Sequence, residues 1–312
     1  MSHLGGVVDR ALDTLVLPGF TNLGMRLRSR LADWPADASK DSLAGRHVAI
    51  TGATSGLGLA TAHMASDLGA HVHLIVRNTG LGHELADSLA GPATVWECDV
   101  SDLESVRRCA QALVASGVVL HALVHNAGAM PAVRTESRQG HEMTMALHVL
   151  GPVLLTEAAL PALAGAHVVF VTSGGMYLQR LHVDDLEYRQ GTYAGATAYA
   201  RSKRAQVELL APLQERWAPQ GITVSATHPG WAATPGVTQS LPTFDRFLKP
   251  LLRSAEEGAD TTVWLIAAPG RRPGGLLWHD RHPRPTSRGA VPQATPQERA
   301  RLLGWVLSAI ES

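Results

Sequence analysis

The feature that most limits the fold of this chain is the alternation, from His47 onward, of short β-branched runs with longer helical patterns. Strands that alternate with helices form a parallel sheet, because a helix is the usual crossover between parallel strands. The sequence therefore predicts an α/β fold of the Rossmann type, a doubly wound, seven-stranded parallel sheet with helices on both faces. We expect its strands at His47–Thr51, His71–Val76, Thr94–Glu97, Ala122–His125, His167–Thr172, Ile222–Thr227 and Leu276–His279.

The chain divides into a main domain and an N-terminal extension. No repeat, low-complexity segment or break in composition interrupts residues 46–290, so we expect residues 46–312, with a C-terminal helix, to form one domain. Residues 1–45 predict two amphipathic helical stretches, near 5–17 and 20–32, with a break at Pro18-Gly19. The apolar face of this extension can dock on the main domain, on a second subunit or on a membrane surface. The polar face lacks a basic excess, which favours a protein surface.

Composition and charge narrow the classes of partner. The 312 residues hold 27 Lys and Arg against 27 Asp and Glu, so no overall positive field attracts nucleic acid, and a small, uncharged substrate is expected. The two cysteines, Cys98 and Cys109, lack disulfide or zinc spacing, which indicates a reducing compartment. Asp9, Arg10 and Asp13 interrupt the N-terminal apolar run, and no segment reaches the ~18 apolar residues of a membrane span. We expect a cytoplasmic protein without an integral membrane segment; a homo-oligomer is compatible with the sequence.

A glycine-rich turn, Thr51–Gly58, joins the first predicted strand to a helix that continues through Asp67. Glycines let the backbone approach a pyrophosphate, and the free N–H groups at a helix N-terminus favour its negative charge. The alternative is a turn that only packs. The position of the turn after the first strand predicts a dinucleotide cofactor, bound by Gly52, Thr54, Ser55, Gly56, Leu57 and Gly58.

The next strand ends indicate which nicotinamide cofactor is bound. The second strand ends without the Asp or Glu that binds an NAD ribose, whereas Arg77, next to Asn78, suits a 2′-phosphate. NADP(H) is therefore expected, although Arg77 can also be an ordinary solvated charge. Two further segments, Asp99-Val100 and Asn126-Ala127-Gly128, lie at the same edge. Asp99 can accept from the adenine amine, while Asn126 can contact cofactor or order its own loop.

The candidate chemical site combines Tyr199, Lys203 and Ser173. Tyr199 and Lys203 are four residues apart, so on a helix they share one face, and an adjacent ammonium lowers the pKa of a phenol. Such a pair alone is more often a surface contact. Ser173, however, follows a buried predicted strand and brings a hydroxyl to the same edge of the sheet. Ser173 and Tyr199 can hold one substrate oxygen while hydride moves to or from nicotinamide.

These motifs, in the order Thr51–Gly58, Asn126–Gly128, Ser173 and Tyr199-x-x-x-Lys203, resemble the short-chain dehydrogenase/reductase family over residues 46–280. The resemblance implies an NADP(H)-dependent oxidoreductase that acts on CH–OH groups and transfers hydride between nicotinamide and a carbonyl or alcohol. It also implies that Tyr199 is the general acid–base, that Ser173 orients the carbonyl, and that Lys203 lowers the tyrosine pKa and binds the nicotinamide ribose.

The stretch after the sixth predicted strand adds to this resemblance. It implies that Pro229, Gly230 and Thr234 lie near the carboxamide and the diphosphate. A narrower similarity, to one subgroup of the family, lies in Ser173–Met176, in His228–Trp231 with Thr234–Val237, and in Trp278–Arg281, and the extension fits that subgroup too.

One residue departs from the family pattern. His148, three residues before Gly151, stands where the family usually has an asparagine that is thought to hold a water linking the lysine to solvent. A histidine can relay protons itself, since its ordinary pKa lies near neutrality. The alternatives are that backbone alone holds the water, or that turnover is impaired. The retained Ser173, Tyr199 and Lys203 favour a working site.

The interval between Ser173 and Tyr199 is long, as in retinol-type dehydrogenases, and such excursions at a ligand edge are commonly functional loops. Core packing explains its apolar side chains as readily as a substrate pocket does. A pocket here predicts an apolar substrate such as a retinoid, a steroid or a lipid aldehyde or ketone. Its walls would be Met176, Leu178, Leu181, Asp185, Leu186, Tyr188, Tyr193, Trp231, Leu241, Phe244, Phe247 and Leu248.

Two further interpretations concern metal and catalysis. His71 and His73 point to one face of their predicted strand, but two ligands without a third seldom form a metal site, so no metal is expected. The rival to an enzyme is a catalytically impaired NADP-binding sensor or scaffold protein, because fold alone does not establish activity.

Overall fold

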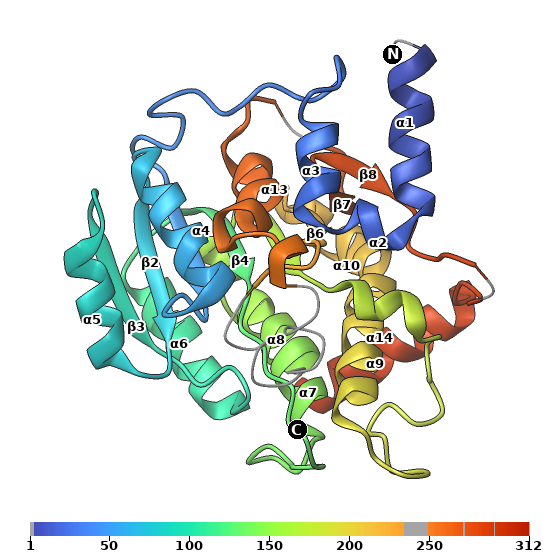
Figure 1. Cartoon of the computed structure of the whole chain (residues 1–312). Helices are drawn as coiled ribbons and strands as arrows, with labels where there is room; N and C mark the ends of the chain where they lie inside the picture. Colours follow the sequence, from blue (N-terminus) through green and yellow to red (C-terminus); the bar gives the residue numbers. More distant parts are fainter. Residues whose placement is uncertain (1–2, 234–248, 271, 290, 312) are drawn as a thin grey trace.

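The structure of this protein is a computed structural model that describes residues 3–233, 249–270, 272–289 and 291–311 (Figure 1). Its centre is one sheet of strand order β3-β2-β1-β4-β5-β6-β7-β8, in which β1 to β7 are parallel and β8 is antiparallel. Strand order reverses between β1 and β4, the place where open α/β sheets bind ligands. The strands are β1 His47–Thr51, β2 His71–Val76, β3 Ala93–Glu97, β4 Leu120–His125, β5 His167–Val171, β6 Thr223–Thr227, β7 Leu276–His279 and β8 His282–Arg284.

Helices cover both faces of the sheet, as the sequence predicts (Figure 1). Alternate residues of one strand enter different cores: Ala49 joins the core with α6, α8, α9 and α14, while Val48 and Ile50 join the core with α4, α5 and α13. The helices are α1 His3–Thr14, α2 Val16–Gly19, α3 Asn22–Arg28, α4 Gly56–Asp67, α5 Thr79–Ser88, α6 Leu103–Ala115, α7 Met143–Met145, α8 Gly151–Ala158, α9 Gly195–Glu208, α10 Leu210–Trp217, α13 Ala255–Ala267 and α14 Pro296–Glu311. Shorter turns are the π-helix η1 Ala146–Leu150 and the 3₁₀ helices η2 Leu160–Ala162, η3 Gly174–Leu178, η4 Ala218–Gln220 and η5 Lys249–Leu251.

The seven predicted strands are confirmed with ends that shift by at most two residues, and the sheet has one more strand than expected. β8 pairs with β7 through a two-residue turn, Asp280-Arg281, whose φ angles are 50° and 57°. Its sequence, His-Pro-Arg, lacks the β-branched or aromatic residues that indicate a strand. The turn also lacks the glycine that usually occupies such positions. Pro283 is accommodated because β8 is the edge strand.

The N-terminal extension lies against the β7–β8 end of the sheet (Figure 1). Phe20 is buried, with its ring 4.4 Å from His228 and 5.2 Å from His279 between centroids. Arg28 donates to Asp280 at 2.7 Å and to Asp9 at 2.8 Å, so a buried ion network joins α1, α3 and the β7–β8 turn. Of the three docking surfaces considered, the structure places the extension on the main domain. Within the described part of the chain, no helix is both long and apolar enough to cross a membrane.

Candidate active site

The turn between β1 and α4 has the shape that a pyrophosphate requires. Gly52 and Gly56 adopt φ angles of 65° and 53°, and a side chain on Gly52 would meet the Cα of Ala127 at 2.8 Å. A side chain on Gly58 would meet the carbonyl oxygen of Gly52 at 2.3 Å. Ser55, the N-cap of α4, makes no side-chain capping bond, so the N–H groups of the first turn are open to an anion. The turn therefore fits a dinucleotide, and it places the predicted Thr54 and Leu57 beside these glycines.

Asn126 orders this turn. Its Nδ2 donates to the carbonyl oxygens of Thr51 and Gly52 at 3.1 and 3.2 Å, and its backbone N–H donates to Thr51 Oγ1. Ala127 donates to the same hydroxyl at 3.0 Å. Of the two roles weighed for Asn126, these bonds are those of a loop-ordering residue. Gly128 lies beside His148, since a Cβ there would be 3.2 Å from His148 Nε2.

The ends of β2 and β3 place the remaining predicted cofactor residues. Arg77 is exposed and has no ion-pair partner among the residues that the structure describes. The Asn78 side chain caps α5 by accepting from Leu81 N at 3.2 Å. Asp99 accepts from the backbone and hydroxyl of Ser101, and Val100 is buried. Arg77 is thus a guanidinium that is available to a ligand.

The stretch after β6 is only partly described. Gly230 has a φ of 74°, and a Cβ there would collide with Arg253 and with the carbonyl oxygen of Phe20. Trp231 N donates to Phe20 O at 2.7 Å, so the N-terminal extension holds the Pro229-Gly230 turn from behind. Thr234 and the expected pocket residues Leu241, Phe244, Phe247 and Leu248 lie outside the described residues.

The structure brings Ser173, Tyr199 and Lys203 together at the end of β5. Ser173 lies just after β5 and is the N-cap of η3, while Tyr199 and Lys203 lie on α9. Thr172 Oγ1 donates to the carbonyl oxygen of Lys203 at 3.2 Å, which fixes α9 against the strand. Lys203 Nζ donates to Val171 O at 2.9 Å and lies 5.6 Å from the centre of the Tyr199 ring.

Burial dominates the titration of this site. It raises the pKa of Tyr199 above its ordinary value, while a hydrogen bond with the Ser173 side chain acts in the opposite direction. Burial also lowers the pKa of Lys203 to about 7. The expectation that the ammonium holds the tyrosine pKa below its ordinary range is therefore wrong for the protein without cofactor. The physical reason is that the Tyr199 phenol lies in partly buried surroundings that disfavour its charged form, while the Lys203 ammonium is bound to Val171 O. Tyr199 is a protonated phenol at neutral pH.

His148 lies behind Tyr199, in η1. Its ring meets the tyrosine ring edge-on, with centroids 5.3 Å apart. Its Nε2 accepts from Ala129 N at 3.2 Å, and its Nδ1 is 2.8 Å from Ser202 Oγ, which itself donates to Tyr199 O. These bonds are satisfied by a neutral ring with its proton on Nδ1. Burial, followed by the charge of Lys203, holds the pKa of His148 well below its ordinary value.

Two residues of this site escaped the sequence analysis. Ser202 bonds His148, and Gln206 Nε2 donates to the carbonyl oxygen of His148 at 2.6 Å. Both follow Tyr199 at helical spacing, three and seven residues later, and both are buried polar side chains on α9. A search along the face of the helix that carries Tyr199 and Lys203 would have found them.

The loop between Ser173 and Tyr199 is ordered by its own polar bonds. Tyr177 donates to Pro285 O at 2.9 Å, and Tyr193 donates to Glu142 at 2.9 Å. Met176 and Leu181 are buried in the main core, whereas Leu178 is 76% exposed. Met176 and Leu181 therefore pack in the core, whereas Leu178 does not. The other predicted wall residues here, Asp185, Leu186, Tyr188 and Trp231, are all at least partly buried.

Comparison with known proteins gives the family of the chain. The model of the short chain dehydrogenase family matches residues 46–243. The chain belongs to this family. Its members use nicotinamide cofactors to oxidise alcohols or reduce carbonyl groups, so the chain is an oxidoreductase of this class. The glycine-rich turn, Ser173, Tyr199 and Lys203 are the residues to which the family resemblance assigns cofactor binding and catalysis.

The narrower similarity noted in the sequence is to dehydrogenase/reductase SDR family member 12, and it is confirmed. The Bos taurus protein of that name is 34% identical over 309 residues, which cover 91% of this chain and 92% of the relative. Human retinol dehydrogenase 12 is 32% identical over 241 residues, which cover 74% of this chain and 76% of the relative. A crystal structure of an uncharacterized protein from Mycobacterium paratuberculosis superposes with a TM-score of 0.71 at 30% identity, covering 88% of this chain and 98% of the other.

Proposed function

We propose that this protein is an NADP(H)-dependent oxidoreductase that reduces the carbonyl group of an apolar aldehyde or ketone, or oxidises the matching alcohol. The observation that supports it best is the cluster of Ser173, Tyr199 and Lys203 at the end of β5, beside a glycine turn shaped for a pyrophosphate. The bound cofactor would supply or accept the hydride. The residues of this chain would bind the substrate oxygen and move its proton.

In the reductive direction Tyr199 donates its phenolic proton to the carbonyl oxygen. The raised pKa of Tyr199 favours this role, since the proton is present at neutral pH. Ser173 donates to the same oxygen and stabilises the negative charge that develops there. Lys203 binds the nicotinamide ribose and, as an ammonium, stabilises the tyrosinate left after proton transfer. In this scheme His148 positions Tyr199 and the loop at Ala129 through neutral hydrogen bonds, while its service as a proton relay stays a prediction.

NADP(H) is proposed as the cofactor because Arg77 is exposed and unpaired within the described structure, at the strand end where an acidic residue would select NAD. The pyrophosphate would be held by the glycine-rich turn, at Gly52, Thr54, Ser55, Gly56, Leu57 and Gly58. The adenosine half would lie against Asn78, Asp99 and Val100. The nicotinamide half would lie against Gly128, Pro229, Gly230 and Thr234. An apolar substrate is proposed because human retinol dehydrogenase 12, by its name, acts on retinol.

Two measurements test this proposal. Fluorescence titration should give tighter binding of NADPH than of NADH, and Arg77→Ala should weaken NADPH binding about tenfold while NADH binding changes little. Tighter binding of NADH by the wild type would refute the role of Arg77. A panel of retinoid, steroid and lipid aldehydes and ketones should then show NADPH oxidation. Cofactor binding without turnover on any member would favour the impaired sensor or scaffold over the enzyme.

A further inference from the structure

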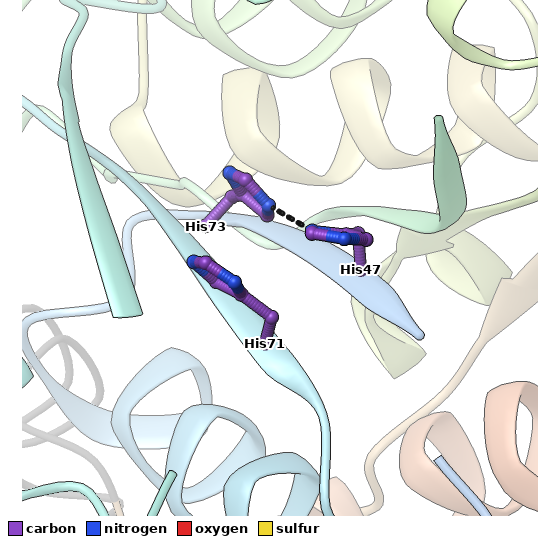
Figure 2. Close-up of side chains that lie close together, drawn as sticks. All are labelled: His47, His71 and His73. Carbon is purple, nitrogen blue, oxygen red and sulfur yellow. Dashed lines mark hydrogen bonds between the residues drawn. The ribbon is translucent and has the colours of Figure 1, made fainter. Parts of the chain in front are cut away.

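Three histidines gather at the amino end of the sheet, away from the proposed active site. His47 is the first residue of β1, and His71 and His73 are the first and third residues of β2. His47 pairs directly with His71 in the parallel register, and side chains two residues apart share one face of a strand. All three imidazoles therefore project from the same face, and Figure 2 shows the rings turned toward one another.

The distances among the rings are those of a ligand cluster. His47 Nδ1 lies 2.8 Å from His73 Nε2, and one ligand atom from each of the three residues lies within 4.8 Å of the others. Two imidazole nitrogens on one tetrahedral Zn²⁺ stand about 3.4 Å apart, since each Zn–N bond is about 2.0–2.1 Å. A metal ion at this point would require the side chains to rotate until the three nitrogens reach that spacing. We propose that His47, His71 and His73 bind one Zn²⁺ ion.

The surroundings leave room for an ion and its remaining ligand. His47 and His73 line an open hollow of about 700 Å³, so a water molecule can complete a three-histidine coordination sphere. Ser116 and Gly117, which follow the last turn of α6, line the same hollow. The C-terminal end of a helix carries partial negative charge and favours a cation. The described residues that line the hollow include no carboxylate and one arginine, Arg46, so the imidazoles are the ligands that the site offers and they bind the ion near a like charge.

Two of the three rings, His71 and His73, lie in surroundings that disfavour their charged forms. Burial, followed by the charges of neighbouring histidines, lowers the pKa of His73 to about 4, and it lowers the pKa of His71. His121 also lines the hollow, but it lies outside the cluster of three and its Nε2 is bonded to Ile266 O at 2.8 Å. His71 Nε2 is 2.9 Å from Thr94 Oγ1, so His71 coordinates either through Nδ1 or after this bond breaks.

Trp96 sets the affinity of the site. Its Nε1–H donates to His73 Nδ1 at 2.9 Å, which places the His73 proton on Nε2, where it is donated to His47. Zn²⁺ at Nε2 moves that proton to Nδ1, so the bond from Trp96 must break. The indole therefore competes with the ion. Removing its N–H while keeping an aromatic ring against His73 should favour metal binding.

The experiment is isothermal titration of ZnCl₂ into chelator-treated protein. The wild type should bind one ion, and His71→Gln and His73→Gln should each weaken binding at least about 100-fold. Trp96→Phe should tighten it about tenfold, as expected for a lost competing hydrogen bond. His83→Gln, on the exposed face of α5, is the matched control and should bind like the wild type. Tighter Zn²⁺ binding by Trp96→Phe distinguishes this site from adventitious binding, because Zn²⁺ bound at other histidines would not respond to the loss of the Trp96 N–H.

Two results would overturn the proposal. One is the absence of a one-to-one phase in the wild type. The other is a one-to-one phase that persists in both His71→Gln and His73→Gln. NADPH binding by each variant, measured by fluorescence, shows whether it is folded, since the cofactor edge is at the opposite end of the strands. If a variant loses NADPH binding, the Trp96→Phe titration decides, because weaker or unchanged Zn²⁺ affinity there contradicts the assigned ligand atoms.

Discussion

Asp280 is the anion on which the attachment of the N-terminal extension depends. It accepts from Arg28 at 2.7 Å and from both terminal nitrogens of Arg253 at 2.6 and 3.0 Å. All three side chains are at most 2% exposed. Burial alone would raise its pKa, but His279 and the two arginines together hold it far below its ordinary range. Replacing Asp280 with Asn removes this charge and leaves two buried guanidinium groups.

Asparagine is the suitable replacement because it preserves both the volume of the side chain and the backbone. Asp280 has a φ of 50°, and Asn tolerates this left-handed conformation better than other residues do. After the change Arg28 keeps the Asp9 carboxylate at 2.8 Å, whereas Arg253 keeps only neutral acceptors among the described residues, from backbone carbonyl groups and the Asn amide oxygen. Breaking a buried pair by removing one partner costs about 3–5 kcal/mol, and the retained Asp9 contact places the expected loss near 3 kcal/mol.

Thermal unfolding followed by circular dichroism measures this loss. At roughly 2–4 °C per kcal/mol for a chain of this class, Asp280→Asn should lower the Tm by about 6–12 °C. Asp184→Asn is the control, because Asp184 and Arg301 form a pair on the surface and its loss should leave the Tm unchanged within error. A fall of less than about 2 °C in Asp280→Asn would refute the view that this network anchors the extension.

Two further predictions concern the active site. His148→Asn should change NADPH affinity by no more than about twofold. It should also leave the pH dependence of kcat between pH 6 and 8 unchanged, because the lowered pKa of His148 keeps the ring neutral there. If a limb of the pH profile disappears in the variant, His148 is a proton relay instead. The value of kcat/KM for NADPH oxidation should fall as pH rises above about 7. The reason is that Lys203, with a pKa lowered to about 7, is an ammonium below that pH and neutral above it. A flat profile from pH 6 to 9 would contradict the need for the ammonium.

The sequence predicts the sheet well because buried parallel strands are continuous β-branched runs. His71–Val76 and His167–Val171 are examples, and the sequence places both to within one residue. β8 was not predicted, because its pairing depends on a tight turn at Asp280-Arg281 that the surrounding ion network stabilises. Local propensity carries no signal for such a tertiary effect.

The sequence predicts which residues form the candidate site better than it predicts their pKa values. Spacing alone put Tyr199 and Lys203 on one face of a helix, and the structure confirms that juxtaposition. The sequence gives the wrong direction for the pKa of Tyr199, because that direction depends on burial, which is known only once the fold is known. The same applies to His47: only the register of β1 against β2 shows that it lies beside His71 and His73.

The most direct test of the proposed chemistry is the single-turnover rate of NADPH oxidation by wild type and Tyr199→Phe with an apolar aldehyde. A proton donor in the transition state contributes about 10²–10⁴-fold, so the variant should be at least about 100-fold slower. NADPH affinity should be unchanged within about twofold, since only one hydroxyl is lost. A variant rate within about threefold of the wild type, with the cofactor bound, would contradict the assignment of Tyr199 as the proton donor.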